Sequence, residues 1–124
     1  MTMRGSIAAA RISGPRLEAD GTAVFEFRFG ADDPTFAGHF PTRPLLPGVF
    51  QLEMARVVAE AVLNCRLAVR EITKAKFLRP IGPAETVRVE LNLSEKDGTI
   101  HARAGFSVQG QPAGETILQL RRSE

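Results

Sequence analysis

The chain has 124 residues, 44% of them hydrophobic, and this length and composition suit a single domain, residues 1–124, with a sizeable core. The formal net charge of +2 is close to neutral, which argues against a nucleic-acid or membrane partner. A single cysteine, Cys65, excludes an internal disulfide, and there is no run of about eighteen apolar residues to cross a membrane. We therefore expect a cytoplasmic protein in which Cys65 is a buried structural thiol between Leu63 and Leu67.

Two strands are predicted before the first long loop. Residues 7–12 are expected to form a strand that ends at Gly14-Pro15, because a Gly-Pro pair interrupts regular structure. Over residues 23–29 aromatic and small apolar side chains occupy every second position, which indicates a half-buried strand. Residues 30–47 form a long loop rich in Asp, Pro and Gly, and so long a structured loop in a compact domain usually has a function.

One helix is predicted, over residues 49–63. Apolar residues cover most of its circumference, which is typical of a buried helix. Its polar residues are spaced three or four apart and form one narrow stripe: Glu53, Arg56, Glu60 and Asn64.

Four strands are predicted after the helix, over residues 70–79, 86–93, 100–108 and 115–120. The pair Asp97-Gly98 indicates a hairpin between the second and third of them, and residues 110–112 separate the last two. The element order is therefore two strands, a helix and four strands. This order predicts an α+β domain in which an antiparallel six-stranded sheet wraps around one long central helix.

Residues 38–53 contain the candidate chemistry. His39 lies in a loop with three prolines, which restrict the backbone around it. Gly48 opens the helix, where free backbone N–H groups and the helix dipole favour negative charge, and Glu53 follows inside the helix. A positioned base, a positioned acid and an oxyanion-binding helix end are what proton removal next to a carbonyl needs.

Each of these residues also has an ordinary structural interpretation. His39 could hydrogen-bond to its loop neighbours, and Gly48 could ease a tight turn. Glu53 could form exposed ion pairs along the polar stripe with Arg56. In the functional interpretation, the apolar surroundings of Glu53 would favour its protonated form near neutral pH, and Arg56 would oppose this if it points the same way.

The same residues resemble the β-hydroxyacyl-(acyl carrier protein) dehydratases of type II fatty-acid synthesis. The first matching block is His39-Phe40-Pro41, Pro44, Pro47-Gly48-Val49 and Glu53, and the second is residues 72–77, Arg79-Pro80 and Pro83. The resemblance covers about residues 32–89. It implies the hotdog fold, in which a sheet wraps around a long central helix, in agreement with the element pattern.

The resemblance also implies an activity, the conversion of a 3-hydroxyacyl thioester to a trans-2-enoyl thioester and water without cofactor or metal. His39 matches the base that removes the C2 proton, and Glu53 matches the acid that acts on the C3 hydroxyl. Gly48 matches the glycine whose N–H binds the thioester carbonyl. The substrate-binding residues are expected to be Gly48, Val49, Phe40 and Pro47.

The implied partners are a second copy of the chain and an acyl donor. In the family the His and the acid come from different subunits, which implies a homodimer, and both a dimer and a trimer of dimers stay open. The acyl chain arrives on acyl carrier protein or on CoA. An acidic carrier would suit the cations Arg43, Lys74, Lys76 and Arg79, although these could equally form a solvated surface.

The sequence departs from the family pattern in three segments, and two other functions stay open. Thr42 replaces a usual Gly, Val57 replaces a usual Gln four residues after the acid, and residues 83–85 replace a Pro-Gly-Asp turn. These changes leave the acyl chain and the pathway open, whether fatty acid, polyene or polyketide. The alternatives are a hotdog acyl thioesterase, in which Glu53 activates water, and a non-catalytic acyl-binding subunit of a dehydratase heterodimer.

Overall fold

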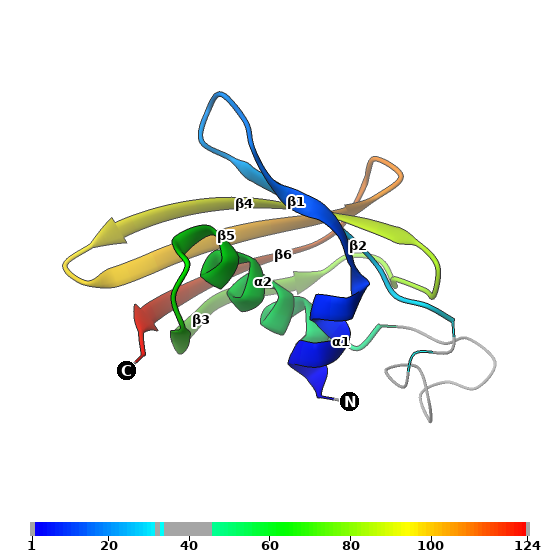
Figure 1. The fold of residues 1–124 in the computed structure, drawn as a ribbon, viewed down its shortest axis with the longest axis horizontal. Helices are drawn as coiled ribbons and strands as arrows, with labels where there is room; N and C mark the ends of the chain where they lie inside the picture. Colours follow the sequence, from blue (N-terminus) through cyan, green and yellow to red (C-terminus); the bar gives the residue numbers. More distant parts are fainter. Residues whose placement is uncertain (1, 32, 34–45, 124) are drawn as a thin grey trace.

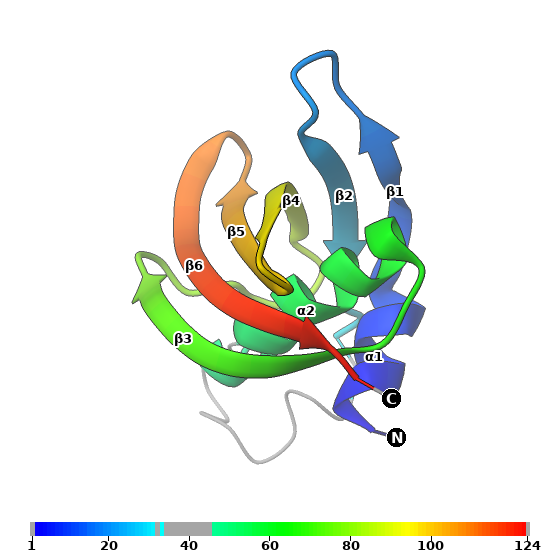
Figure 2. The ribbon, with the colours of Figure 1, turned by 90° about the vertical axis from the view of Figure 1, so that its left-hand side faces the viewer.

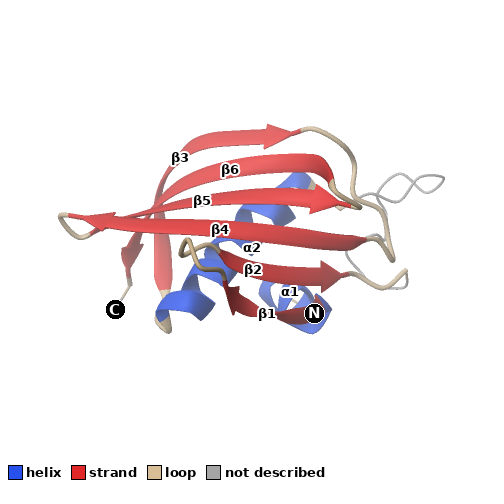
Figure 3. Ribbon diagram, turned by 90° about the horizontal axis from the view of Figure 1, so that it is seen from above, coloured by secondary structure: helices blue, strands red, loops and turns tan. Residues whose placement is uncertain are grey.

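The computed structural model describes residues 2–31, 33 and 46–123. Within them, one antiparallel sheet of six strands curls around a central helix (Figures 1 and 2). The helices are α1 (Met3–Ala10) and α2 (Gly48–Leu63), and the strands are β1 (Arg11–Leu17), β2 (Ala23–Arg28), β3 (Leu67–Phe77), β4 (Thr86–Lys96), β5 (Thr99–Val108) and β6 (Gln111–Arg122). The strand order β1-β2-β4-β5-β6-β3 is visible from above in Figure 3. The predicted α+β architecture is confirmed.

The core lies between α2 and the concave face of the sheet. Met54, Ala55, Val58 and Ala59 on α2 are fully buried. The strands supply the matching apolar layer from alternate positions, as in the burial pattern of β5. Each large aliphatic or aromatic side chain buried in this way contributes about 1.5–3 kcal/mol, so the apolar circumference of α2 explains its central position.

The first element differs from the predicted strand over residues 7–12. Met3–Ala10 is a helix, and its N-terminus is capped by Thr2, whose hydroxyl accepts a hydrogen bond from Gly5 N–H at 2.9 Å. Three consecutive alanines end the helix, and alanine has the highest helix propensity. Ile7 and Ala10 are buried against the core, which fixes α1 beside α2 (Figure 1).

Strand β1 continues through Gly14-Pro15, where the sequence predicted an end. Proline is tolerated because β1 is an edge strand, and its register against β2 shifts on both sides of Ser13. Gly14 has a φ of 107°, and a Cβ there would lie 2.7 Å from the Val24 carbonyl oxygen. Glycine is therefore required for β1 to approach β2 this closely.

The predicted hairpin at Asp97-Gly98 is confirmed, with positive φ at both residues. The hairpin between β5 and β6 has the same form, with φ of 52° at Gln109 and 79° at Gly110. This tight turn lets β6 begin at Gln111, earlier than the predicted residue 115. Pro112 is accommodated because the register shifts beside its partner Ser107.

Strand β3 is the other edge of the sheet and is exposed along most of its length. It begins at Leu67 and ends at Phe77, so it is shifted toward the N-terminus from the predicted 70–79. Val69, Ile72 and Phe77 on this strand are 43–50% exposed. The thiol of Cys65, which lies between the end of α2 and the start of β3, is free and half-buried, where a buried thiol was predicted. No helix in the described part of the chain is long and apolar enough to span a membrane.

Candidate active site

The long loop before α2 is anchored at both described ends. At its start, the Phe29 ring contacts the Phe50 ring of α2 edge to face, with centroids 6.1 Å apart. At its end, Leu46 N–H donates a hydrogen bond to the Ile81 carbonyl at 2.7 Å. The chain therefore leaves and returns beside the start of α2. His39 and Phe40, predicted as base and substrate contact, lie outside the described residues.

The start of α2 combines the predicted substrate-binding residues Pro47, Gly48 and Val49. Pro47 is the N-cap and provides no side-chain hydrogen bond to the first turn. A Cβ at Gly48 would lie 2.9 Å from Cε2 of Phe77, so glycine lets the helix start approach the end of β3. Val49 is 52% exposed. An uncapped helix N-terminus has free N–H groups that suit a developing negative charge.

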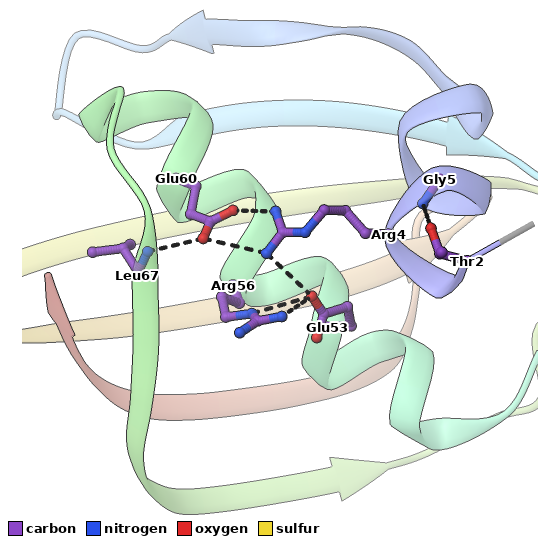
Figure 4. Close-up of polar contacts among 7 residues, drawn as sticks. All are labelled: Thr2, Arg4, Gly5, Glu53, Arg56, Glu60 and Leu67. Atoms are coloured by element: carbon purple, nitrogen blue, oxygen red, sulfur yellow. Dashed lines mark hydrogen bonds and ion pairs between the residues drawn. The ribbon is translucent and has the colours of Figure 1, made fainter. Parts of the chain in front are cut away.

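Glu53 lies on the face of α2 that the sheet leaves uncovered, and its side chain is 19% exposed (Figure 4). Its Oε1 accepts hydrogen bonds from Arg56, at 2.5 Å from Nη2 and 3.1 Å from Nε. Arg4 of α1 approaches the same oxygen, with Nη2 at 3.8 Å. The Arg56 pair is the one that i,i+3 spacing allows. Arg56 thus points toward Glu53, as the ion-pair interpretation requires.

Glu60 is the best-partnered carboxyl of the polar stripe. Arg4 donates to it from both guanidinium ends, through Nη1 to Oε1 and through Nη2 to Oε2 at 3.4 Å. Leu67 N–H donates to Oε2 at 2.9 Å. Burial acts to raise the pKa of Glu60, but these hydrogen bonds outweigh it, and the pKa lies below its usual value. Glu60 therefore remains ionised while it joins α1, α2 and the start of β3 (Figure 4).

A lowered carboxyl pKa makes stability depend on pH. The contribution of Glu60 is present above its unfolded-state pKa and is lost as the pH falls through the folded value. We expect Glu60→Gln to lower unfolding free energy by about 1–2 kcal/mol at pH 7, because Arg4 loses its charged partner at a site that is partly solvent-screened. At pH 3 the deficit should shrink. Thermal melts of wild type and variant from pH 3 to 7 measure this, and Glu90→Gln, on an exposed side chain, is the matched control. A deficit that stays constant with pH would contradict the charged pairing.

Of two hollows in the described part of the chain, only the smaller is lined by residues close to Glu53 and Glu60 in α1 and α2. The larger, about 770 Å³, is lined by Lys76, Arg88, Glu115 and others, and includes no candidate catalytic residue. The smaller, about 230 Å³, lies between α1, α2, β1 and β2 and is lined by Arg4, Ala8, Arg11, Phe25, Phe27, Val57 and Val58. Val57 occupies the position of the glutamine that is usual in the family. The wall of the smaller hollow is therefore apolar at this position. Among the described residues, no three His, Cys, Asp or Glu side chains gather as metal ligands would.

Comparison with known proteins identifies the family. A family model of ApeI-like proteins, described as ApeI dehydratase, matches residues 16–116. The chain belongs to the ApeI-like dehydratase family. In the solved ApeI:P dehydratase heterocomplex from Xenorhabdus doucetiae, one chain has 27% identity and a TM-score of 0.73, over 90% of this chain and 96% of that one. The hotdog fold and the resemblance to dehydratases are thus confirmed for this member of the ApeI-like family.

Two curated relatives are 3-hydroxyacyl-[acyl-carrier-protein] dehydratases FabZ. The protein from Desulforamulus reducens is 42% identical over 77 residues, which are 56% of this chain and 54% of that protein. The protein from Chloroflexus aggregans is 34% identical over 110 residues, which are 82% of this chain and 76% of that protein. This ApeI-like chain therefore spans about half the length of the first relative.

Sequence reasoning missed Arg4 and the role of Glu60. Arg4 precedes the first predicted element, and it meets Glu60 only because α1 packs beside α2. One signal was available, since threonine is a preferred helix N-cap and Thr2 precedes Met3 and Arg4, which favour a helix. The contact itself, between residues 56 apart in the chain, has no sequence signal.

Proposed function

We propose that the protein removes water from a 3-hydroxyacyl thioester held on acyl carrier protein. The observation that supports this most directly is an uncapped glycine start of α2 with a carboxyl on the same helix, in a chain of a dehydratase family. Gly48 N–H binds the thioester carbonyl and stabilises the enolate, beside Val49, Pro47 and Phe40. His39 takes the C2 proton. The C3–O bond then breaks, and Glu53 gives a proton to the departing hydroxyl, which leaves as water.

The test of this proposal is an assay with two readouts. Incubation with a 3-hydroxyacyl thioester on carrier protein should produce the absorbance of a conjugated enoyl thioester, and addition of water to crotonyl thioester should remove it. A thiol reagent in the same cuvette reports hydrolysis. Enoyl formation without free thiol supports the dehydratase, whereas free thiol without enoyl product would show a thioesterase.

The second copy of the chain is proposed to pair with the β3 edge. This strand is 11 residues long, exposed and carries large apolar side chains, and such an edge attracts a further strand. Pairing there would bring a partner beside α2, and His39 of one subunit would serve Glu53 of the other. The inference is a homodimer, and a trimer of dimers satisfies the same contact. Sedimentation that finds an active monomer at micromolar concentration would contradict it.

One observation favours a second candidate function. The Xenorhabdus doucetiae structure is by its name a heterocomplex, and a chain of this family can therefore share its assembly with a different subunit. The protein could be the acyl-binding, non-catalytic member of such a pair. Under this alternative the purified chain binds an acyl thioester without turning it over, and mixing with a related chain restores turnover.

The basic docking surface proposed for the carrier is smaller than the sequence indicated. Lys74 pairs with Glu115 at 2.6 Å, and Arg79 pairs with Glu85 at 3.1 Å. Arg43 lies outside the described residues. Lys76 is exposed and makes no ion pair among the described residues, so it is the cation most available to an acidic carrier.

We expect Lys76→Glu to lower kcat/KM for carrier-bound substrate by about 3–10-fold at low salt, because a like charge now faces the acidic carrier. The loss should shrink in high salt, where charges are already screened. Turnover of a small pantetheine thioester should change by less than about twofold. Lys96→Glu, at the far end of β4, is the matched charge reversal (Figure 3). Equal losses on both substrates would place Lys76 in the fold or the site and not in carrier docking.

A further inference from the structure

The two carboxylate oxygens of Glu53 have different surroundings. Oε1 accepts both hydrogen bonds from Arg56 and is the oxygen that Arg4 approaches at 3.8 Å. Oε2 has no such partner among the described residues. Figure 4 shows the two guanidinium groups converging on one oxygen from different directions. The carboxyl is therefore held by one oxygen and presents the other.

Arg4 is held firmly enough to influence this arrangement. It comes from α1, and both ends of its guanidinium are bound by Glu60. Glu60 is itself fixed by Leu67 N–H at 2.9 Å. Two charge-assisted hydrogen bonds from one planar guanidinium group restrict the orientation of an arginine side chain more than a single exposed ion pair does. Arg4 thus has a defined position that does not depend on Glu53.

We propose that Arg4 is a positioning residue that sets which oxygen of Glu53 carries the transferable proton. This inference rests on the proposed dehydratase function. Two cations at Oε1 favour negative charge on that oxygen, so a proton on the carboxyl resides on Oε2. Oε2 is then the atom that gives its proton to the departing C3 hydroxyl. In this role Arg4 acts through Glu53 and not by its own contact with the C3 hydroxyl.

Arg56 alone fixes the oxygen less completely. It lies on the same helix as Glu53, its side chain is 27% exposed, and it joins Glu53 across a single turn. Such a pair is worth about 0.3–0.5 kcal/mol. Arg4 approaches from a second element, and the two directions together restrict rotation of the carboxyl. Loss of Arg4 should therefore lower kcat more than a single contact of 3.8 Å between Arg4 Nη2 and Glu53 Oε1 would suggest.

The test is a double-mutant cycle between Arg4 and Glu53, read in the hydration of crotonyl thioester. Arg4→Met should lower kcat about tenfold and leave KM within about twofold, since the ground-state contacts of the substrate are untouched. Arg4→Lys should recover part of the loss, because a point charge still reaches Oε1. In a Glu53→Gln background, Arg4→Met should cause no further loss, because no carboxyl proton remains to be placed. Arg16→Met, on the exposed face of β1, is the matched control for charge removal and should leave kcat unchanged.

The outcomes separate this inference from the proposed function. A wild-type protein that does not hydrate crotonyl thioester would overturn the dehydratase function and the role of Arg4 with it. An active wild type with an unchanged Arg4→Met variant would overturn only the positioning role. Equal losses from Arg4→Met in both backgrounds would also overturn it, because a residue that merely holds α1 in place lowers activity whether or not Glu53 can carry a proton.

Discussion

Replacing Glu53 by glutamine is expected to lower turnover of the 3-hydroxyacyl thioester by about 10²–10⁴-fold, the usual range for loss of a general acid. Glutamine keeps the size and the hydrogen-bonding capacity of the side chain but cannot pass a proton. Alanine would be a poorer test because it would also empty space on the face of α2. The measurement is kcat from the initial rate of enoyl-thioester formation.

Stability should change little in the same variant. Glu53 is partly exposed and bonded to Arg56 across one turn, so the lost pairing is worth at most about 1 kcal/mol. Glu90→Gln removes a more exposed carboxylate and controls for the charge change. A thermal midpoint lowered by several degrees, with kcat intact, would show that Glu53 serves an ion pair and not the reaction.

The elements with strong periodicity were predictable. From Phe25 to Arg28, β2 alternates phenylalanine with charged residues, which predicts a strand with one buried face. Helix α2 is apolar nearly all round, which predicts a buried helix. The Asp97-Gly98 turn was predictable for a local reason, because Asp followed by Gly is a favoured pair where both residues need positive φ. The wrapped sheet followed from the order of these elements.

The N-terminal region was not predictable in the same way. Residues 7–10 are too few to show a periodicity, and the helix there follows from the three alanines, the Thr2 cap and packing against the core beside α2. Passage of β1 through Gly14-Pro15 depends on its edge position, which is a property of the whole sheet. Contacts between distant segments, such as Arg4 with Glu60, arise only once those positions are set.

Some features of the candidate site also follow from the local sequence, and others depend on contacts between distant segments. The Glu53–Arg56 pair follows from spacing along one helix, and the free helix start at Gly48 follows from Pro47, which has no side-chain oxygen to act as a cap. The approach of Arg4 to Glu53 does not follow from either. Sequence alone identified the carboxyl, and the structure identified what holds its Oε1.

Substituting His39 by alanine should abolish hydration and dehydration, a loss of about 10²–10⁴-fold, because no other base is predicted at C2. The fold should be retained, since the sequence places His39 in the long loop before α2, outside every predicted strand and helix. His101→Ala, on β5, is the matched control, because it removes the chain's other histidine. Circular dichroism checks the fold, and enoyl absorbance checks the rate. A near wild-type rate in His39→Ala would remove this residue from the mechanism.

Mixing His39→Ala with Glu53→Gln subunits tests whether the two residues act across a subunit interface. Each variant alone has two defective sites per dimer. In a symmetric dimer, a mixed pair contains one site with both defects and one site with neither. Equal mixing makes half of the dimers mixed, so activity should return to about a quarter of wild type after unfolding and refolding together. Sites built within one subunit would stay inactive at every ratio. Recovery that needs co-refolding, and does not follow simple mixing, would also show that the dimer exchanges slowly, as expected if β3 joins the subunits through backbone hydrogen bonds.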